Sequence, residues 1–295
     1  MNSFGRLFAW LTGRRPRRWR VVWVLLSGLL STADTRAQQE VSPGVFLLGR
    51  IGDTNVNESS GVVSSRRGKG AFWTHNDGDN NLWAFTLAGL PLGKWSVSVP
   101  ALYDWEDVAW SPGRIYIADI GNNALTNFIA RVYAVPEPGP TFSGNLPLKD
   151  VWRLTYPNNQ PFDSESLLIF RRNGYIIAKN LEGGEARVYR FPLSRKRTVE
   201  LQPLCELDVD APVGGADLTR DGNRLAIITE IGAYLFQLPG GIPESGQLEP
   251  TVFVFHRLDR MEGCAFTRDG LLVTAETGEI LLFTHPGFKT GRLRP

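Results

Sequence analysis

The segments Asp104-Trp105-Glu106-Asp107-Val108-Ala109-Trp110 and Ile115-Tyr116-Ile117-Ala118-Asp119-Ile120-Gly121-Asn122-Asn123 together form the clearest repeating unit of this chain. Acidic residues stand at the start of one short apolar strand and at the end of the next. Because consecutive antiparallel strands place the start of one beside the end of the other, both acidic groups are expected at one rim of a sheet. Weaker copies of this arrangement recur, which indicates a repeated all-β architecture.

The repeating unit has the length of a propeller blade. Five segments align as equivalent inner strands, and their first residues lie 48, 59, 49 and 48 positions apart, a spacing typical of blades. A second and a third strand follow each of them, and four units also have an outer strand. The inner segments are 58–63, 106–110, 165–169, 214–218 and 262–266. The sequence therefore predicts an all-β fold, a single β-propeller.

The number of blades follows from the two ends of the repeat. The fifth unit ends before its outer strand, and residues 45–50 can supply that strand. Such pairing would close the ring and protect the sheet edges. Five blades closed by an N-terminal strand are therefore expected, with six as the alternative if the long region 123–163 contains a further sheet.

The first 37 residues have the pattern of an export signal. Five arginines between positions 14 and 20 precede an apolar run at 21–30, and Thr35-Arg36-Ala37 offers small residues for cleavage. The apolar run is well short of the roughly 20 residues that span a bilayer. We expect a signal peptide at 1–37, a propeller domain at 38–288 and a basic tail at 289–295. The processed protein is expected to be periplasmic or secreted, without a membrane span.

Charge and cysteine content bear on partners and on covalent bonds. Of the 32 basic and 30 acidic residues, seven and one lie in residues 1–37, which leaves 25 against 29 and a formal charge of −4. Such a chain lacks the basic face of a nucleic-acid-binding protein, and no nucleic-acid partner is expected. Cys205 and Cys264 fall on strands of different blades. Because a disulfide needs Cα atoms within about 7 Å, two buried thiols are expected.

Acidic residues recur at the starts of the inner strands, which line the central channel of a propeller. Four carboxylates at one level of a narrow channel repel one another and lose solvation, so they need cations, protons or hydrogen-bond donors. Oxygen ligands favour calcium or magnesium over zinc, and a divalent cation, calcium in the first place, is the expected cofactor. The predicted metal ligands are Glu58, Glu106, Asp119, Asn122, Glu165 and Glu262. The alternative is that these acids anchor turns and backbone amides once per blade.

Other polar residues near the strand ends are candidates for binding a ligand at the channel mouth. Lys179 could neutralise one carboxylate, and Asp217 is a weaker candidate because it lies three positions after the residue that matches Glu262. Residues 75–81 carry oxygen donors around a glycine as a calcium loop does, but a turn explains the same residues. The predicted ligand-binding residues are Asn76, Asp77, Asp104, Lys179, Asp217, Glu230 and Glu276.

Standard catalytic signatures are missing from the sequence. There is no Gly-x-Ser-x-Gly, His-Glu-x-x-His or Cys-x-x-Cys motif and no phosphate-binding glycine loop. His75 alone among the three histidines stands beside the acidic residues, where it could act as a general base or a metal ligand. A histidine in a turn is the commoner case. The catalytic residues are therefore unknown, with His75 as a candidate.

Several of these motifs together resemble a family of secreted bacterial β-propeller proteins. They are Glu58-Ser59-Ser60-Gly61, His75-Asn76-Asp77, Asp104-Trp105-Glu106-Asp107, Asp119-Ile120-Gly121-Asn122-Asn123 and Glu262-Gly263. The resemblance covers roughly residues 44–285. The family is itself distantly similar to NHL-type, gluconolactonase-like and phytase-like propellers. It implies a calcium or other divalent ion in or near the channel and, for some members, hydrolysis of phosphate esters or lactones. This sequence matches too few metal-site residues to assign a reaction.

Three functions follow as hypotheses. The first is an exported propeller, a monomer, whose acidic channel mouth binds a divalent cation and a small molecule or a protein. The second is a metal-dependent hydrolase of phosphate esters or lactones that uses the same rim, and the third is a non-enzymatic scaffold for protein interactions. Fold alone does not decide among them.

Overall fold

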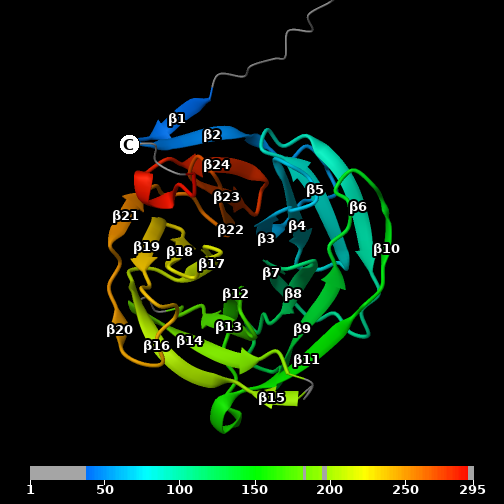
Figure 1. Cartoon of the computed structure of the whole chain (residues 1–295), viewed down its shortest axis with the longest axis vertical. Coiled ribbons are helices and arrows are strands. Elements are labelled where there is room, and N and C mark those ends of the chain that lie inside the picture. Colours follow the sequence, from blue (N-terminus) through cyan, green and yellow to red (C-terminus); the bar gives the residue numbers. More distant parts are fainter. Residues whose placement is uncertain (1–37, 182–183, 195–197, 292–295) are drawn as a thin grey trace, which may run out of the picture. The chain divides into compact units, whose positions relative to one another are not determined.

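The computed structural model describes residues 38–181, 184–194 and 198–291, which form five sheets arranged in a ring (Figure 1). The prediction of an all-β, five-bladed propeller is confirmed. The signal peptide expected at 1–37 lies outside the described residues, as do the last four residues of the tail. Within the described ranges no helix is long and apolar enough to cross a membrane.

Each blade is built from strands that run in order from the centre of the ring to its outside. The inner strands are β3 (Ser59–Ser64), β7 (Trp105–Ser111), β12 (Ser164–Phe170), β17 (Val213–Leu218) and β22 (Met261–Phe266). The second strands are β4 (Ala71–Asn76), β8 (Arg114–Asp119), β13 (Asn173–Ala178), β18 (Arg224–Thr229) and β23 (Leu271–Ala275). The third strands are β5 (Asn81–Thr86), β9 (Ile129–Pro136), β14 (Gly184–Pro192), β19 (Gly232–Gln237) and β24 (Glu279–Phe283). The fourth strands are β6 (Pro91–Val97), β11 (Asp150–Thr155), β16 (Gln202–Val209) and β21 (Val252–Phe255).

The fifth blade takes its fourth strand from the N-terminal end of the domain. Strand β2 (Val45–Arg50) pairs antiparallel with β24, and β1 (Gln39–Ser42) pairs with β2 at the edge. Val45 is fully buried, and the Thr284 amide donates to the Gly44 carbonyl at 2.9 Å. The predicted closure by an N-terminal strand is therefore confirmed.

Short strands from one blade extend the sheet of the blade before it. Strands β10 (Gly144–Leu146), β15 (Thr198–Glu200) and β20 (Gln247–Leu248) pair parallel with β6, β11 and β16, respectively. The long region 123–163 thus supplies β9, β10 and β11 and contains no sixth sheet. These additions cover edges that would otherwise present unpaired backbone groups.

The hydrophobic core lies between neighbouring blades. One cluster joins Trp73 of β4 and Leu82 of β5 to Ile117 of β8 and Tyr133 of β9. All four side chains are fully buried, and each aromatic one buries about 150–250 Å². Because each sheet packs against two others, the packing fixes the inner strands around the centre of the ring.

The two cysteines lie apart in the ring, on β16 and β22. Both are free and buried, and burial raises their thiol pKa values. The prediction of two buried thiols without a bridge is confirmed.

Candidate metal centre

Every inner strand carries a β-bulge at the same level. In β7, Trp105 faces Asp119 and Asp107 faces Ala118, so Glu106 is an extra residue. The same shift occurs in the other four inner strands. The extra residues are Glu106, Glu165, Gly214 and Glu262, and in β3 Ser60 and Gly61 together face His75. A bulge re-aims the extra residue, which explains why acidic residues at these positions gather at the centre of the ring.

This register corrects the predicted ring of four equivalent carboxylates. Ser60, and not Glu58, occupies the bulge position of β3, and its hydroxyl donates to the Glu106 carbonyl at 2.8 Å. Glu58 lies two residues earlier, beside Asp77. A hydrogen bond between those two side chains, followed by the Asp77 charge, raises the pKa of Glu58. Three carboxylates therefore share the bulge level.

Glu106, Asp163 and Glu165 form a compact acidic triad. All three are buried, and one oxygen of each lies within 4.8 Å of the others. Asp163, which is 6% exposed, accepts hydrogen bonds at Oδ1 from the amides of Asn122 (2.7 Å) and Ser164 (3.1 Å). Its Oδ2 is buried and has no hydrogen-bond partner among the described residues. An unsatisfied buried carboxylate oxygen costs free energy, and a cation would remove that cost.

Among the described residues, Lys179 is the cationic side chain that forms ion pairs with the triad. Its ammonium contacts Glu165 Oε1 and lies 3.8 Å from Asp163 Oδ2. Three ionised carboxylates and one ammonium leave a net charge of −2. A bound divalent cation would neutralise this charge, and so would protonation of two of the carboxylates.

Burial raises the pKa values of three acids at this site, Glu106, Glu262 and Asp104. Burial, and then the charge of Glu165, raises the pKa of Glu106 well above its usual range and that of Glu262 to about 8. Burial and the charge of Asp77 raise the pKa of Asp104 to about 6. At neutral pH the site therefore carries protons that a bound cation would displace.

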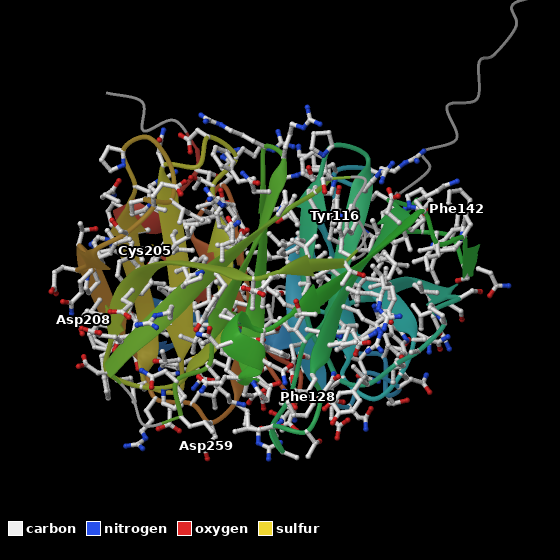
Figure 2. All side chains as sticks on the ribbon, turned by 90° about the horizontal axis from the view of Figure 1, so that it is seen from below. Tyr116, Phe128, Phe142, Cys205, Asp208 and Asp259 are labelled. Carbon is white, nitrogen blue, oxygen red and sulfur yellow. The ribbon has the colours of Figure 1, made fainter. Side chains whose placement is uncertain are left out.

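Two members of the triad, Glu106 and Glu165, line a cavity of about 390 Å³ at the end of the ring where the inner strands begin. We call this cavity the acidic mouth. Phe128 and Asp259, which are labelled along the lower edge of Figure 2, lie in loops at this end. Seven carboxylates and two cationic side chains line it. The predicted residues among its lining are Asp77, Asp104, Glu106, Glu165, Lys179, Glu230, Glu262 and Glu276.

Gly121 forms the floor against which two of the acids rest. A Cβ atom at Gly121 would lie 2.1 Å from Glu106 Oε1 and 2.4 Å from Asp104 Oδ2. A side chain at this position would displace these carboxylates, so the glycine allows the backbone after β8 to approach them. The amides of Ile120 and Gly121 also donate to the Asp104 carbonyl at 3.1 and 3.2 Å.

Two predicted metal ligands, Asp119 and Asn122, are hydrogen-bonded to neighbouring loops. The Asp119 carboxylate accepts from the amides of Tyr103 (2.9 Å) and Asp104 (2.7 Å) and from the Tyr133 hydroxyl (3.2 Å). The Asn122 side chain is hydrogen-bonded to the Asn127 backbone at both ends. Neither side chain belongs to the triad, and Asn122 contributes through its backbone amide, which positions Asp163.

The turn after β4 is also held by its own polar groups. The Asn76 amide nitrogen donates to the Asn55 carbonyl (2.8 Å) and to Asp79 (2.9 Å), while its Oδ1 accepts from the Glu58 amide (3.3 Å). The Asn76 side chain is thus buried and hydrogen-bonded within the turn, and it is not among the residues that line the acidic mouth.

His75 does not fit the role of a general base. It is fully buried, its Nε2 accepts from the Gly61 amide at 3.2 Å, and Nδ1 lies 3.0 Å from the Asn76 carbonyl. Burial lowers its pKa to about 4. With one nitrogen donating and the other accepting, the neutral ring has no free site for substrate.

Asp217 ties inner strands together at a distance from the acidic mouth. Its Oδ2 accepts from the Phe266 amide on β22 at 2.7 Å and its Oδ1 from the Leu218 amide at 2.8 Å. Asp107 spans β7 and β12 in the same way by accepting from the Leu167 amide at 2.8 Å. The structural alternative therefore describes these two acids.

Asp163 is the site residue that sequence reasoning misses. It stands two residues before the bulge glutamate Glu165, as Asp104 stands two residues before Glu106. The repeated Asp-x-Glu spacing was the signal that could have identified it.

Comparisons with known proteins provide only distant likenesses. No family model and no curated protein matches this chain. A glutaminyl cyclase from Myxococcus xanthus is 10% identical over 77% of this chain and 90% of that chain, with a TM-score of 0.47. A gluconolactonase from Xanthomonas campestris is 12% identical over 82% and 80%, with a TM-score of 0.41. A hydrazine synthase from Kuenenia stuttgartiensis is 12% identical over 75% of this chain but only 56% of its own, with a TM-score of 0.41.

Proposed function

We propose that this chain is an exported, monomeric β-propeller that binds a divalent cation, calcium in the first place, at its acidic mouth. A small molecule or a protein partner binds at the same mouth, where the cavity gives access to the cation. Glu106, Asp163 and Glu165 are the proposed cation ligands. The processed chain acts in the periplasm or outside the cell, and nucleic acid is not its partner because the mouth is acidic.

The observation that supports this proposal best is Oδ2 of Asp163, which is buried and accepts no hydrogen bond among the described residues. It lies next to two other carboxylates, and the single ammonium of Lys179, 3.8 Å away, offsets only part of their mutual repulsion. Calcium binds oxygen at about 2.3–2.6 Å, so two ligands of one ion lie no more than about 5 Å apart. The triad oxygens, within 4.8 Å of one another, meet this limit.

The experiment is a titration of the chelator-treated protein, residues 38–295, with calcium, magnesium and zinc by isothermal titration calorimetry. We expect calcium to bind and Asp163→Asn and Glu106→Gln to weaken binding by about tenfold or more, since each removes a charged ligand. Gly121→Ala should also weaken binding, because it displaces carboxylates without removing charge. Glu244→Gln is the control, since that side chain is 71% exposed and paired with Arg190.

A structural role for the acids predicts a different result. In that case elemental analysis finds no bound metal, and chelation leaves the melting temperature unchanged. The triad would then be held by protons and by Lys179, and the scaffold function would take precedence.

A metal-dependent hydrolase of phosphate esters or lactones is the second candidate. It is favoured by Glu262, which lines the acidic mouth and whose pKa of about 8 keeps it protonated at neutral pH, as a general acid requires. A screen of phosphate esters and lactones, with and without calcium, tests it in the same samples. Turnover that Glu262→Gln abolishes while calcium binding persists would support this candidate, and turnover that survives chelation would contradict it.

A further inference from the structure

A second cavity lies at the opposite end of the ring from the acidic mouth. Its volume is about 450 Å³, and the last residues of four inner strands line it: Ser64, Ser111, Phe170 and Leu218. The acidic mouth, in contrast, is lined by residues at the beginnings of inner strands. We call this second cavity the basic mouth.

Three arginines and one acid line the basic mouth. The guanidinium carbons of Arg66 and Arg220 lie 5.2 and 5.1 Å from the ring centre of Trp110, and that of Arg171 lies 4.9 Å from the ring centre of Phe170. The acid is Asp217, and both its oxygens already accept backbone amides.

These arginine side chains differ from others on the same protein. Within the described residues none of the three forms an ion pair or a side-chain hydrogen bond, whereas Arg187 and Arg260 are each paired with a glutamate. Burial and the charge of Arg220 lower the pKa of Arg66. Stacking on an aromatic ring favours a single cation, but it does not remove the repulsion between two.

Glu137 fixes this arrangement in place. It is buried; its Oε1 accepts from the Arg66 amide at 2.6 Å and from the Ser65 hydroxyl at 2.9 Å, and its Oε2 accepts from Trp110 Nε1 at 2.7 Å. Its hydrogen bonds orient the indole and the loop that carries Arg66. The indole beside which both exposed guanidinium groups lie is therefore fixed before any ligand arrives, which lowers the entropy lost on binding.

We propose that the basic mouth is a second binding site, independent of the cation site, for a small organic anion. The carboxylate or phosphate group of the ligand lies between Arg66 and Arg220, because a guanidinium group matches both oxyanions with paired hydrogen bonds. The apolar part of the ligand packs against Ile169 and Phe170, which line the same cavity.

Calorimetry of residues 38–295 with benzoate, phenyl phosphate and inorganic phosphate tests this site, with benzyl alcohol as the uncharged probe. We expect the organic anions to bind and the alcohol not to bind. Arg66→Gln and Arg220→Gln should each weaken anion binding by about tenfold or more, since each removes a charge-assisted hydrogen bond. The chain offers a matched control in Arg268→Gln. Arg268 occupies the same place as Arg220 in the repeated turn Thr-Arg-Asp-Gly, is 86% exposed and does not line the cavity.

The relative affinities of phenyl phosphate and benzoate distinguish a phosphate site from a carboxylate site. Tighter binding of phenyl phosphate assigns the site to phosphate esters, and tighter binding of benzoate assigns it to carboxylates. Inorganic phosphate that binds as tightly as phenyl phosphate would show that the apolar wall contributes nothing, which would overturn the organic part of the proposal. The site itself is wrong if no anion binds at millimolar concentration, or if Arg268→Gln weakens binding as much as Arg220→Gln.

Discussion

Lys179 is the residue at which two ways of neutralising the acidic mouth can be separated. Its ammonium contacts Glu165 and is 26% exposed at the side chain. If it only completes a structural ion pair, its removal leaves buried carboxylates without compensation, which costs about 3–5 kcal/mol for a fully buried pair and less here because of its exposure. If a cation shares the site, Lys179 also competes with that cation through repulsion.

We therefore predict that Lys179→Met lowers the melting temperature of the calcium-free protein but tightens calcium binding by about tenfold. Calcium should then restore much of the lost stability, because it binds only the folded arrangement. Calorimetry and thermal unfolding measure the two effects, with the exposed Lys149→Met as the control. Loss of stability that calcium does not restore would show that Lys179, and not a metal, is the counter-charge of the triad.

At the level of single residues, the sequence predicts site residues correctly where the same amino acid recurs in each blade. It fails where the pairing register of the strands determines which residue reaches the site. Glu106, Glu165 and Glu262 are found because each is a glutamate that starts an apolar strand. Glu58 is assigned to the wrong position because it is a glutamate like Glu106 and Glu165, whereas Ser60 holds the equivalent position in the bulge. The Asp-x-Glu spacing points to Asp163 as a candidate, but its orientation depends on the Asn122 amide, a contact between two blades that the spacing does not contain.

At the level of elements, the strands of each blade are predictable because their alternation and spacing are local properties of the sequence. The short strands β10, β15 and β20 are not, because each has only two or three residues and pairs with a different blade. Region 123–163 is long because it contains the short strand β10 in addition to β9 and β11. The bulges are equally invisible, since a bulge is defined by the partner strand.

Strand β2 permits a direct test of how the ring is closed. A chain that starts at Thr54 lacks β1 and β2, so β24 loses its partner and Val45 leaves the core. We predict that this chain melts more than about 10 °C below a chain that starts at Gln38, since each kcal/mol lost shifts the melting temperature by about 2–4 °C. A chain that starts at Pro43 is the control, because it lacks only β1. Equal melting temperatures for the Thr54 and Gln38 chains would show that β2 does not hold the ring closed.

At the level of the whole molecule, the two ends of the ring have opposite charge. Seven acids face two cations at the acidic mouth, whereas three arginines face one aspartate at the basic mouth. Asp107 and Asp217, of which Asp217 also lines the basic mouth, are hydrogen-bonded to the backbone of neighbouring inner strands. The fold thus contains acids whose oxygens accept backbone amides of the inner strands and, apart from them, the acids that line the acidic mouth.

The raised pKa values of acids at the acidic mouth give the stability of the protein a defined dependence on pH. The folded-state pKa values of Glu262 (about 8) and Asp104 (about 6) lie above their ordinary values of 4.5 and 3.8, so the folded protein binds more protons than the unfolded chain between those limits. Stability contributed by these groups is therefore present at low pH and is lost as the pH rises. His75 has the opposite sign, because its pKa falls from 6.5 to about 4, and it lowers stability below about pH 6.5.

We predict that the melting temperature of the calcium-free protein falls between pH 6 and pH 8.5, where Glu262 loses its proton. Calcium should flatten this decline, because the ion replaces protons as the compensating charge and binds more tightly as they leave. Glu262→Gln should flatten the curve of the calcium-free protein, since it removes the group that titrates in this range, whereas Glu244→Gln should leave the slope unchanged. Scanning calorimetry at several pH values, with chelator and with calcium, measures all four curves. A calcium-free protein whose stability does not fall above pH 6 would show that Glu262 is ionised at neutral pH, and the acidic mouth would then lack the proton that both the linkage to calcium and the general-acid role require.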